Sequence, residues 1–146
     1  CCLESLPEAA VHLTDVLGFS WPHRGAGGAV AFHDPCRLVR PDDLGGAPRA
    51  LLAAATGQPA FEFVDRGTET GCCGAGDSFA LFFPEEGKAT AAYRLRDPAV
   101  AAAGTLTTAC SRCTAHLAEV APDGIDVVDL AEVLVETLPP AGDGPP

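Results

Sequence analysis

Four short strand-like segments, of which the first is an apolar run typical of a buried β-strand, recur along this chain and alternate with helix-forming stretches. The strand-like segments are 29–34 (AVAFHD), 60–64 (AFEFV), 105–109 (TLTTA) and 125–128 (IDVV). The helix-forming stretches are 47–56, 79–83, 88–103 with an interruption at Pro98, 111–120 and the segment LAEVLVETL, which Asp129 caps. This alternation predicts an α/β fold with an open, mostly parallel four-stranded sheet and helices on both faces.

Five of the seven cysteines lie in the loops that follow the first three of these segments. They are Cys36, Cys72, Cys73, Cys110 and Cys113. In an open parallel sheet, the functional crevice lies beyond the carboxyl ends of the strands. We therefore expect the five cysteines, which come from three loops distant in sequence, to converge on one edge of the sheet.

The cysteine spacing favours metal chemistry. The C-x-x-C turn at Cys110 and Cys113 lets two thiolates face one metal, as in zinc and iron–sulfur sites. A disulfide between the adjacent Cys72 and Cys73 would strain their shared peptide, whereas two adjacent thiolates can ligate neighbouring metals. Thiolates alone do not select between zinc and iron. The residues leave three alternatives open: an iron–sulfur cluster, a zinc site, and a metal-free C-S-R-C pair that forms a reversible disulfide.

The residues around the adjacent cysteines are small. The glycines at 71, 74 and 76 permit positive φ and a close approach of the backbone, so we expect them to make room for the inorganic sulfide of a cluster. Asp77 and Ser78 stand where this loop leads into a short helix. Either side chain suits a helix cap, and we favour Asp77 in that role.

Three polar side chains stand beside the cysteines in the sequence. His33 either donates a hydrogen bond or a proton to a cluster sulfur, or serves as a structural residue at the end of its strand. Arg37 and Arg112 adjoin cysteines and would either offset the negative charge of a thiolate-bound cluster or be solvated.

Charge and hydropathy argue against two classes of partner. The net charge is −11 with only nine Lys and Arg residues, which argues against a nucleic-acid phosphate surface and against an anionic membrane. No apolar run approaches the roughly 18 residues that a spanning helix needs, and the N-terminal residues lack the pattern of a signal peptide. We expect a cytoplasmic protein, in which clustered thiols serve metal or redox chemistry.

The cysteine pattern resembles the CCG cysteine-rich domain found in heterodisulfide reductases. It also resembles the iron–sulfur subunits of glycolate oxidase, lactate utilisation and anaerobic glycerol-3-phosphate dehydrogenase complexes. The similar segments are HDPCRLVR at 33–40, PRALLAAATG at 48–57, GCCGAGDSF at 71–79, TACSRCTAHL at 108–117 and VVDLAEVL at 127–134. Two long and nearly equal gaps separate the single cysteine, the CCG and the C-x-x-C, which makes the combined pattern far more specific than any one piece.

The resemblance implies a non-cubane [4Fe–4S] cluster, held as metal ligands by Cys36, Cys72, Cys73, Cys110 and Cys113. It implies an oxidoreductase subunit that receives electrons from a flavin- or ferredoxin-type partner and passes them to a disulfide or quinone-linked acceptor. Such a subunit would reach the cytoplasmic membrane face only through its partners. Some domains of the family bind zinc, so a structural zinc-binding or docking module without redox activity stays the alternative.

The chain departs from the family pattern at two positions. Arg37 stands where the family commonly has His, and Asp77 stands where it commonly has a further Gly. Neither change removes a ligand, but both are expected to alter the cluster potential or the access of substrate.

The domain organisation includes a possible repeat. The chain has no Met and opens on CCLESL, so we expect it to be a piece of a longer protein. Residues 2–17 parallel residues 113–134, from a shared Cys-x-x-x-Leu to a shared Val-Leu. We predict the remnant of a preceding CCG repeat and a linker at 1–28, one CCG domain at 29–138, and a disordered Pro/Gly-rich tail at 139–146.

Overall fold

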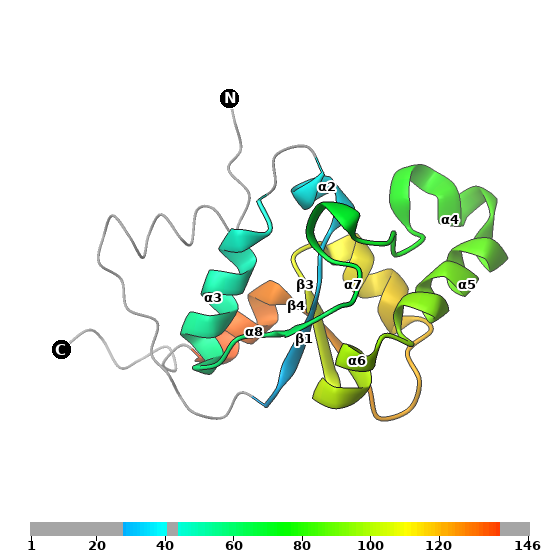
Figure 1. Cartoon of the computed structure of the whole chain (residues 1–146). Helices are drawn as coiled ribbons and strands as arrows, with labels where there is room; N and C mark the ends of the chain where they lie inside the picture. Colours follow the sequence, from blue (N-terminus) through cyan, green and yellow to red (C-terminus); the bar gives the residue numbers. More distant parts are fainter. Residues whose placement is uncertain (1–27, 41–43, 138–146) are drawn as a thin grey trace.

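The computed structural model describes residues 28–40 and 44–137, and these contain one sheet of four short strands (Figure 1). The strands are β1 (Val30–His33), β2 (Phe61–Glu62), β3 (Thr105–Thr108) and β4 (Asp126–Asp129). They are ordered β2-β1-β3-β4, and all three pairings are parallel. The predicted parallel sheet is confirmed, and each strand overlaps one of the predicted strand-like segments.

Helices fill every connection between the strands. They are α2 (Cys36–Val39), α3 (Gly46–Thr56), α4 (Phe79–Phe82), α5 (Pro84–Arg94), α6 (Pro98–Ala103), α7 (Ser111–Ala118) and α8 (Leu130–Thr137). Two 3₁₀ turns, η1 (Gly67–Glu69) and η2 (Gly76–Ser78), lie between β2 and α4. The predicted interruption at Pro98 separates α5 from α6, and Asp129 caps α8 by accepting a hydrogen bond from the backbone N–H of Ala131 at 3.0 Å.

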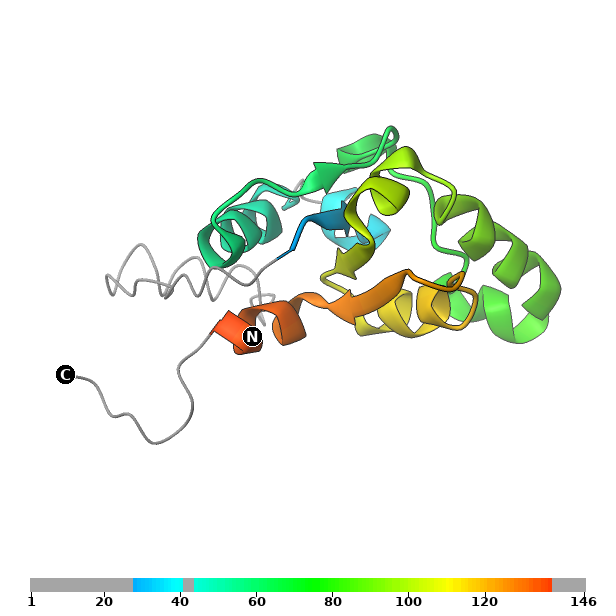
Figure 2. The ribbon, with the colours of Figure 1, turned by 90° about the horizontal axis from the view of Figure 1, so that it is seen from below.

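The helices cover both faces of the sheet, as Figure 2 shows for α3 and α8 on one side and for α5 and α7 on the other. Side chains alternate along a strand, so Ala31 packs with α5, α6 and α7 while Phe32 packs with α3 and α8. The chain moves from β1 to β2 in one direction and from β2 to β3 in the other. Right-handed crossovers in opposite directions place their helices on opposite faces, which accounts for the two layers.

The strand order creates a topological switch point between β1 and β3. These strands are neighbours, but the chain leaves β1 toward β2 and leaves β3 toward β4, on opposite sides. Ligands of open α/β sheets bind beyond the carboxyl ends of the strands at such a point. Cys36 begins the helix after β1, and Cys110 precedes the helix after β3, so the fold brings two of the five cysteines to this place.

Helix α4 projects away from the sheet (Figure 1), and the expectation that Asp77 caps it is wrong. Ser78 occupies the cap position with φ 70°, and its side chain makes no cap hydrogen bond. Asp77 has φ 45°, and its carboxylate instead forms an ion pair with the guanidinium of Arg37. With this positive φ, the Asp77 side chain lies at the start of α2 and does not cap the N-terminus of α4.

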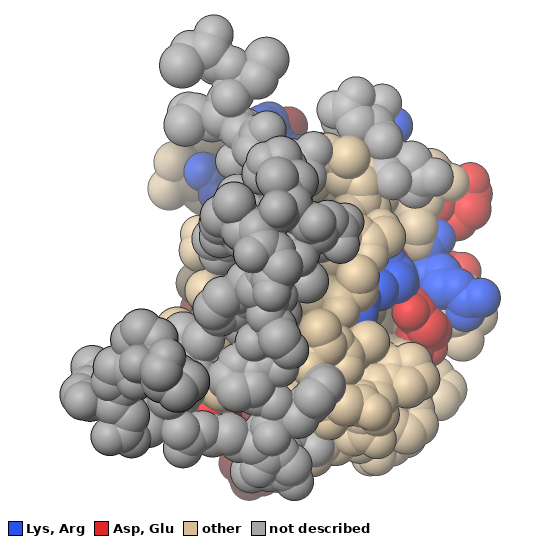
Figure 3. Space-filling view, turned by 90° about the vertical axis from the view of Figure 1, so that its left-hand side faces the viewer, with Lys and Arg blue, Asp and Glu red and all other residues tan. Residues whose placement is uncertain are grey.

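Charges on the face shown in Figure 3 are mixed, since Lys and Arg side chains there lie next to Asp and Glu. In the described part of the chain, no helix is both long and apolar enough to cross a membrane. The predicted repeat remnant and linker at 1–28 and the predicted tail at 139–146 lie outside the described residues, apart from Gly28.

Candidate metal site

The cysteines predicted as ligands gather at the carboxyl edge of the sheet. A pocket of about 350 Å³ opens there. Its lining residues are Pro35, Cys36, Arg37, Cys73, Gly76, Asp77, Cys110, Arg112 and Cys113. Cys72 does not line the pocket, but it lies near Cys36. The pKa of Cys36 is raised by burial and, to a smaller extent, by the Cys72 thiol. The predicted convergence of the three loops is therefore present.

Hydrogen bonds tie the Cys36 loop to the loop that carries Cys72. The backbone N–H of Gly67 donates to Asp34 Oδ2 at 2.7 Å, and the hydroxyl of Thr70 donates to the Asp34 carbonyl at 3.3 Å. Arg40, which ends α2, donates from Nη2 to the Thr70 carbonyl at 2.8 Å. Together these bonds hold the two thiol-bearing loops side by side.

An ion network that the sequence analysis missed fixes the base of these loops. Arg49 on α3 binds both carboxylate oxygens of Asp34 at 2.8 Å and both of Glu62 on β2 at 2.7 Å. The Asp34 side chain is fully buried. Burial raises the pKa of Asp34, but the hydrogen bonds from Arg49 and Gly67 outweigh it and hold this pKa below its usual value. The network therefore connects the end of β1 with β2 and α3, three elements that are distant in sequence.

The glycines of the CCG loop do not all serve the role expected of them. Only Gly74 has positive φ, at 90°, and a Cβ there would lie 2.5 Å from the Gly87 carbonyl of α5. A Cβ on Gly71 would meet the Arg94 guanidinium at 2.9 Å, whereas one on Gly76 would meet only the Cys72 sulfur at 4.0 Å. The expectation that all three make room for sulfide is therefore wrong for Gly71 and Gly74, which admit the side chain of Arg94 and the backbone of α5.

Replacing Gly74 by alanine is expected to lower the free energy of unfolding by about 2–4 kcal/mol, since the change adds backbone strain and forces α5 outward. Chemical denaturation of the purified protein measures this loss. Gly76→Ala is the matched control, and we expect it to change stability by no more than about 0.5 kcal/mol. Equal losses in the two variants would show that the approach of α5 does not explain Gly74.

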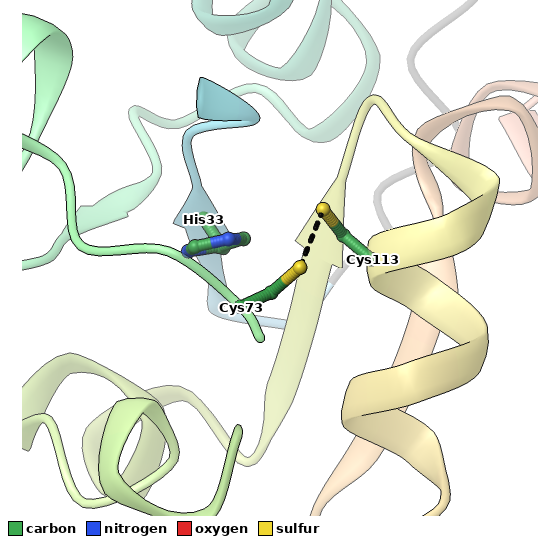
Figure 4. Close-up of side chains that lie close together, drawn as sticks. All are labelled: His33, Cys73 and Cys113. Carbon is green, nitrogen blue, oxygen red and sulfur yellow. Dashed lines mark hydrogen bonds between the residues drawn. The ribbon is translucent and has the colours of Figure 1, made fainter. Parts of the chain in front are cut away.

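Two buried thiols form the centre of the site (Figure 4). The sulfurs of Cys73 and Cys113 are 3.2 Å apart and share a hydrogen bond. Cys73 comes from the CCG loop and Cys113 from the first turn of α7. The contact therefore links the segment that follows β2 with the segment that follows β3. The imidazole of His33, at the end of β1, lies beside them, and the donor atoms of the three side chains are all within 4.8 Å of one another.

The hydrogen bonds among the thiols favour thiolates at two positions. The bond with Cys113 is the main effect that holds the pKa of Cys73 well below its usual value, with further contributions from His33 and the backbone of Ala75. The bond with Cys113 also outweighs burial and, with the backbone N–H groups at the start of α7, lowers the pKa of Cys110 to about 6. The same two bonds and burial raise the pKa of Cys113. Among these three thiols, the hydrogen bonds favour the thiolate form at Cys73 and Cys110 over Cys113.

The residues fit a metal group held by thiolates. All five described cysteines are free thiols, and four of them line one pocket. Buried polar atoms normally have hydrogen-bond partners, yet His33 Nδ1 and Thr108 Oγ1 at this edge are buried without one among the described residues. Four thiols around one pocket, with the imidazole of His33 beside two of them, are the surroundings that a metal–sulfur group would complete.

Charged side chains stand at the mouth of the pocket. Arg37 and Asp77, the two departures from the family pattern, pair with each other there, and Arg112 is exposed beside them. The side chains of Arg37 and Asp77 are 80% and 79% exposed, so their ion pair adds little to stability. These residues therefore set the charge at the entrance of the pocket.

The fold and the site define a class: an open α/β domain that gathers a cysteine-rich, thiolate-bearing pocket at its topological switch point. Comparison with family models identifies the family within this class. The CCG cysteine-rich domain model matches residues 30–118, and this chain belongs to that family.

Curated relatives of known description match the chain over most of its length. A polypeptide of the dihydromethanophenazine:CoB–CoM heterodisulfide reductase of Methanosarcina barkeri is 29% identical over 92% of this chain and 35% of its own length. A probable iron–sulfur-binding oxidoreductase of Bacillus subtilis is 29% identical over 75% of this chain and 16% of its own length. A probable membrane-anchored ferredoxin of Chromohalobacter salexigens is 32% identical over 77% of this chain and 18% of its own length.

The chain is short beside these relatives. It spans about one third of the length of the heterodisulfide reductase polypeptides that it matches. No solved structure matches the chain.

Proposed function

We propose that this chain is an iron–sulfur redox module, in which Cys36, Cys72, Cys73, Cys110 and Cys113 ligate a cluster of the non-cubane [4Fe–4S] type. The observation that carries the proposal is the gathering of four of these thiols, from three sequence-distant loops, around one pocket at the switch point, with the fifth, Cys72, near Cys36. Relatives described as iron–sulfur oxidoreductases or ferredoxins support the same function.

The number of thiols favours a cluster over a single structural zinc ion. A structural zinc site is almost always tetrahedral and uses four ligands, so one of five thiols would be left over. The adjacent Cys72 and Cys73 have different neighbours, because Cys73 contacts Cys113 while Cys72 lies near Cys36. One CCG turn thus serves both sides of the site, as a group with several metal atoms requires. The alternative is a structural zinc-binding or docking module, and the metal analysis described below distinguishes it from the proposed function.

A bound iron–sulfur cluster supplies one-electron transfer at potentials that its protein surroundings set. The residues of this chain prepare the place for it. Cys73 and Cys110 offer thiolates, and the apolar packing of Cys73 and Cys113 against α5, α6 and α7 keeps water from the inner side of the pocket. Arg37 and Arg112 at the mouth offset part of the negative charge that thiolates and sulfides bring.

The redox partner in this proposal is a flavin- or ferredoxin-type protein, and the acceptor is a disulfide or a quinone-linked carrier. Support comes from the relatives, one described as part of a heterodisulfide reductase and another as a membrane-anchored ferredoxin. A preceding CCG repeat in the full-length protein belongs to the same proposal. The free thiols support a location in the cytoplasm, at the membrane face only through the partners.

Metal and sulfide analysis of protein purified without oxygen tests the proposal. We expect iron and acid-labile sulfide at about four each per chain, with visible absorbance that is bleached on reduction. Zinc without visible absorbance would instead establish the structural zinc module. A reversible thiol oxidation that survives complete removal of iron would favour a metal-free disulfide between Cys110 and Cys113.

A further inference from the structure

His33 is a buried side chain whose hydrogen bonding the fold leaves incomplete. Its ring is 1% exposed and lies 5.7 Å from the ring of Phe63, and Nδ1 has no partner among the described residues. A buried polar atom without a partner costs about 1–3 kcal/mol. A group bound from outside the chain can complete such an atom, and the thiols of Cys73 and Cys113, whose sulfurs lie within 4.8 Å of a donor atom of His33, place a metal-bound group within its reach.

Thr108 has the same property at the same edge of the sheet. It is the register partner of His33 across the β1–β3 pairing, and its hydroxyl is fully buried without a partner in the described part of the chain. Register partners in neighbouring strands lie on the same face. Two unpaired polar side chains therefore stand together at the carboxyl ends of the two strands that define the switch point.

The neighbouring residue of β3 provides a control on the opposite face of the sheet. Thr107 is also buried, and its hydroxyl has no partner within residues 28–40 and 44–137, but its register partner is Phe32, which packs with α3 and α8. Its face is the one opposite to Cys73 and Cys113, which pack with α5, α6 and α7. Thr107 and Thr108 thus form a natural matched pair, equal in burial and different only in the face they occupy.

We propose that His33 and Thr108 are positioning residues of the metal site, which donate hydrogen bonds to sulfur atoms of the bound iron–sulfur group. The inference rests on the proposed function, because it requires such a group in the pocket. A hydrogen bond to a cluster sulfur favours the more electron-rich, reduced state, so the pair raises the reduction potential.

Isosteric substitution, combined with potentiometry of the bound cluster, tests whether His33 and Thr108 donate these hydrogen bonds. Thr108→Val is expected to lower the reduced-to-oxidised ratio of the cluster about tenfold at a fixed potential, which is about 59 mV for one electron. Thr107→Val is the control, and we expect it to leave the midpoint potential unchanged. His33→Leu is expected to shift the potential in the same direction as Thr108→Val, while His33→Gln, which keeps an N–H donor, restores part of the shift.

His116→Leu is the control for the histidine. Its imidazole is buried, and Nε2 has no partner among the residues described, but it lies one turn beyond Cys113 on α7 and is not part of the group of three donors. We expect the His116→Leu potential to match that of the unchanged protein. Equal shifts in Thr107→Val and Thr108→Val, or in the two histidine variants, would overturn the inference and indicate a general effect of core packing.

Stability without the cluster gives a second readout. Removing an unpaired hydroxyl from cluster-free protein should not lower Tm, so Thr108→Val is expected to melt at or above the temperature of the unchanged protein. A clear drop would mean that the hydroxyl already has a partner in the chain, and it would overturn the inference. If the unchanged protein binds no iron and sulfide, the proposed function and this inference fall together. An unchanged potential in iron-loaded variants overturns this inference alone.

Discussion

Replacing Arg49 by methionine is expected to lower the free energy of unfolding by about 3–5 kcal/mol, the loss typical of removing one partner from a buried ion pair. Asp34 is fully buried, and Arg49 supplies hydrogen bonds to both of its carboxylate oxygens. Without the guanidinium, a carboxylate would remain in the core with one backbone N–H, that of Gly67, as a donor. Methionine keeps most of the side-chain volume, so the loss reports on charge and hydrogen bonding.

Urea denaturation followed by circular dichroism measures the effect. Lys88→Met is the matched control, because it removes the exposed ion pair between Lys88 and Glu119, whose atoms are 2.8 Å apart. An exposed pair contributes about 0–1 kcal/mol. Arg49→Lys should lose most of the stability as well, since an ammonium cannot bind two carboxylates in bidentate fashion. Arg49→Met and Lys88→Met losing similar amounts would contradict the structural role of the network.

Replacing Cys73 by serine is expected to abolish the iron–sulfur absorbance and to reduce the iron and sulfide content at least about tenfold. Its sulfur contacts Cys113, and its thiolate is the one that His33 and the backbone of Ala75 also stabilise. Cys110→Ser is expected to have a similar effect, because Cys110 is the second favoured thiolate. Serine replaces sulfur by a poorer ligand with little change of volume, so the fold should persist.

Metal content, visible spectra and circular dichroism of protein purified without oxygen separate loss of the cluster from loss of the fold. Cys1→Ser is the control, since Cys1 lies outside the five-cysteine pattern. We expect that variant to keep its absorbance. A similar loss of absorbance in Cys73→Ser, Cys110→Ser and Cys1→Ser would contradict the assignment of the ligands.

Local patterns predicted most of the architecture. The apolar run that ends at Pro35 and the Thr-rich run before Cys110 each marked a strand, because a buried strand needs consecutive side chains that avoid water. Helix α2 was missed, since four residues are too few to show a helical period. The start of α5 at Pro84 was placed four residues late, although Pro is favoured at the first turn of a helix.

Side-chain roles were harder to predict where they depend on contacts between distant residues. Asp77 was expected to cap α4 because its residue type and position suit a cap, but its positive φ directs it to Arg37. Gly74 was expected to admit sulfide, but α5 occupies that space. The buried network of Asp34, Arg49 and Glu62 could not be predicted, because their spacing in the sequence follows no recognisable pattern.

The sequence by itself determined the class of this protein, because the order of strands, helices and cysteines is a property of the chain. A parallel sheet brings the carboxyl ends of its strands to one edge, so three cysteine-bearing loops had to meet there. Only the tertiary structure decided which thiols their neighbours favour as thiolates, which glycine the approach of a helix requires, and which of two adjacent threonines lies on the same face of the sheet as Cys73 and Cys113. Those outcomes depend on distances of a few ångströms between residues far apart in sequence, and they are set when the helices pack on the two faces of the sheet.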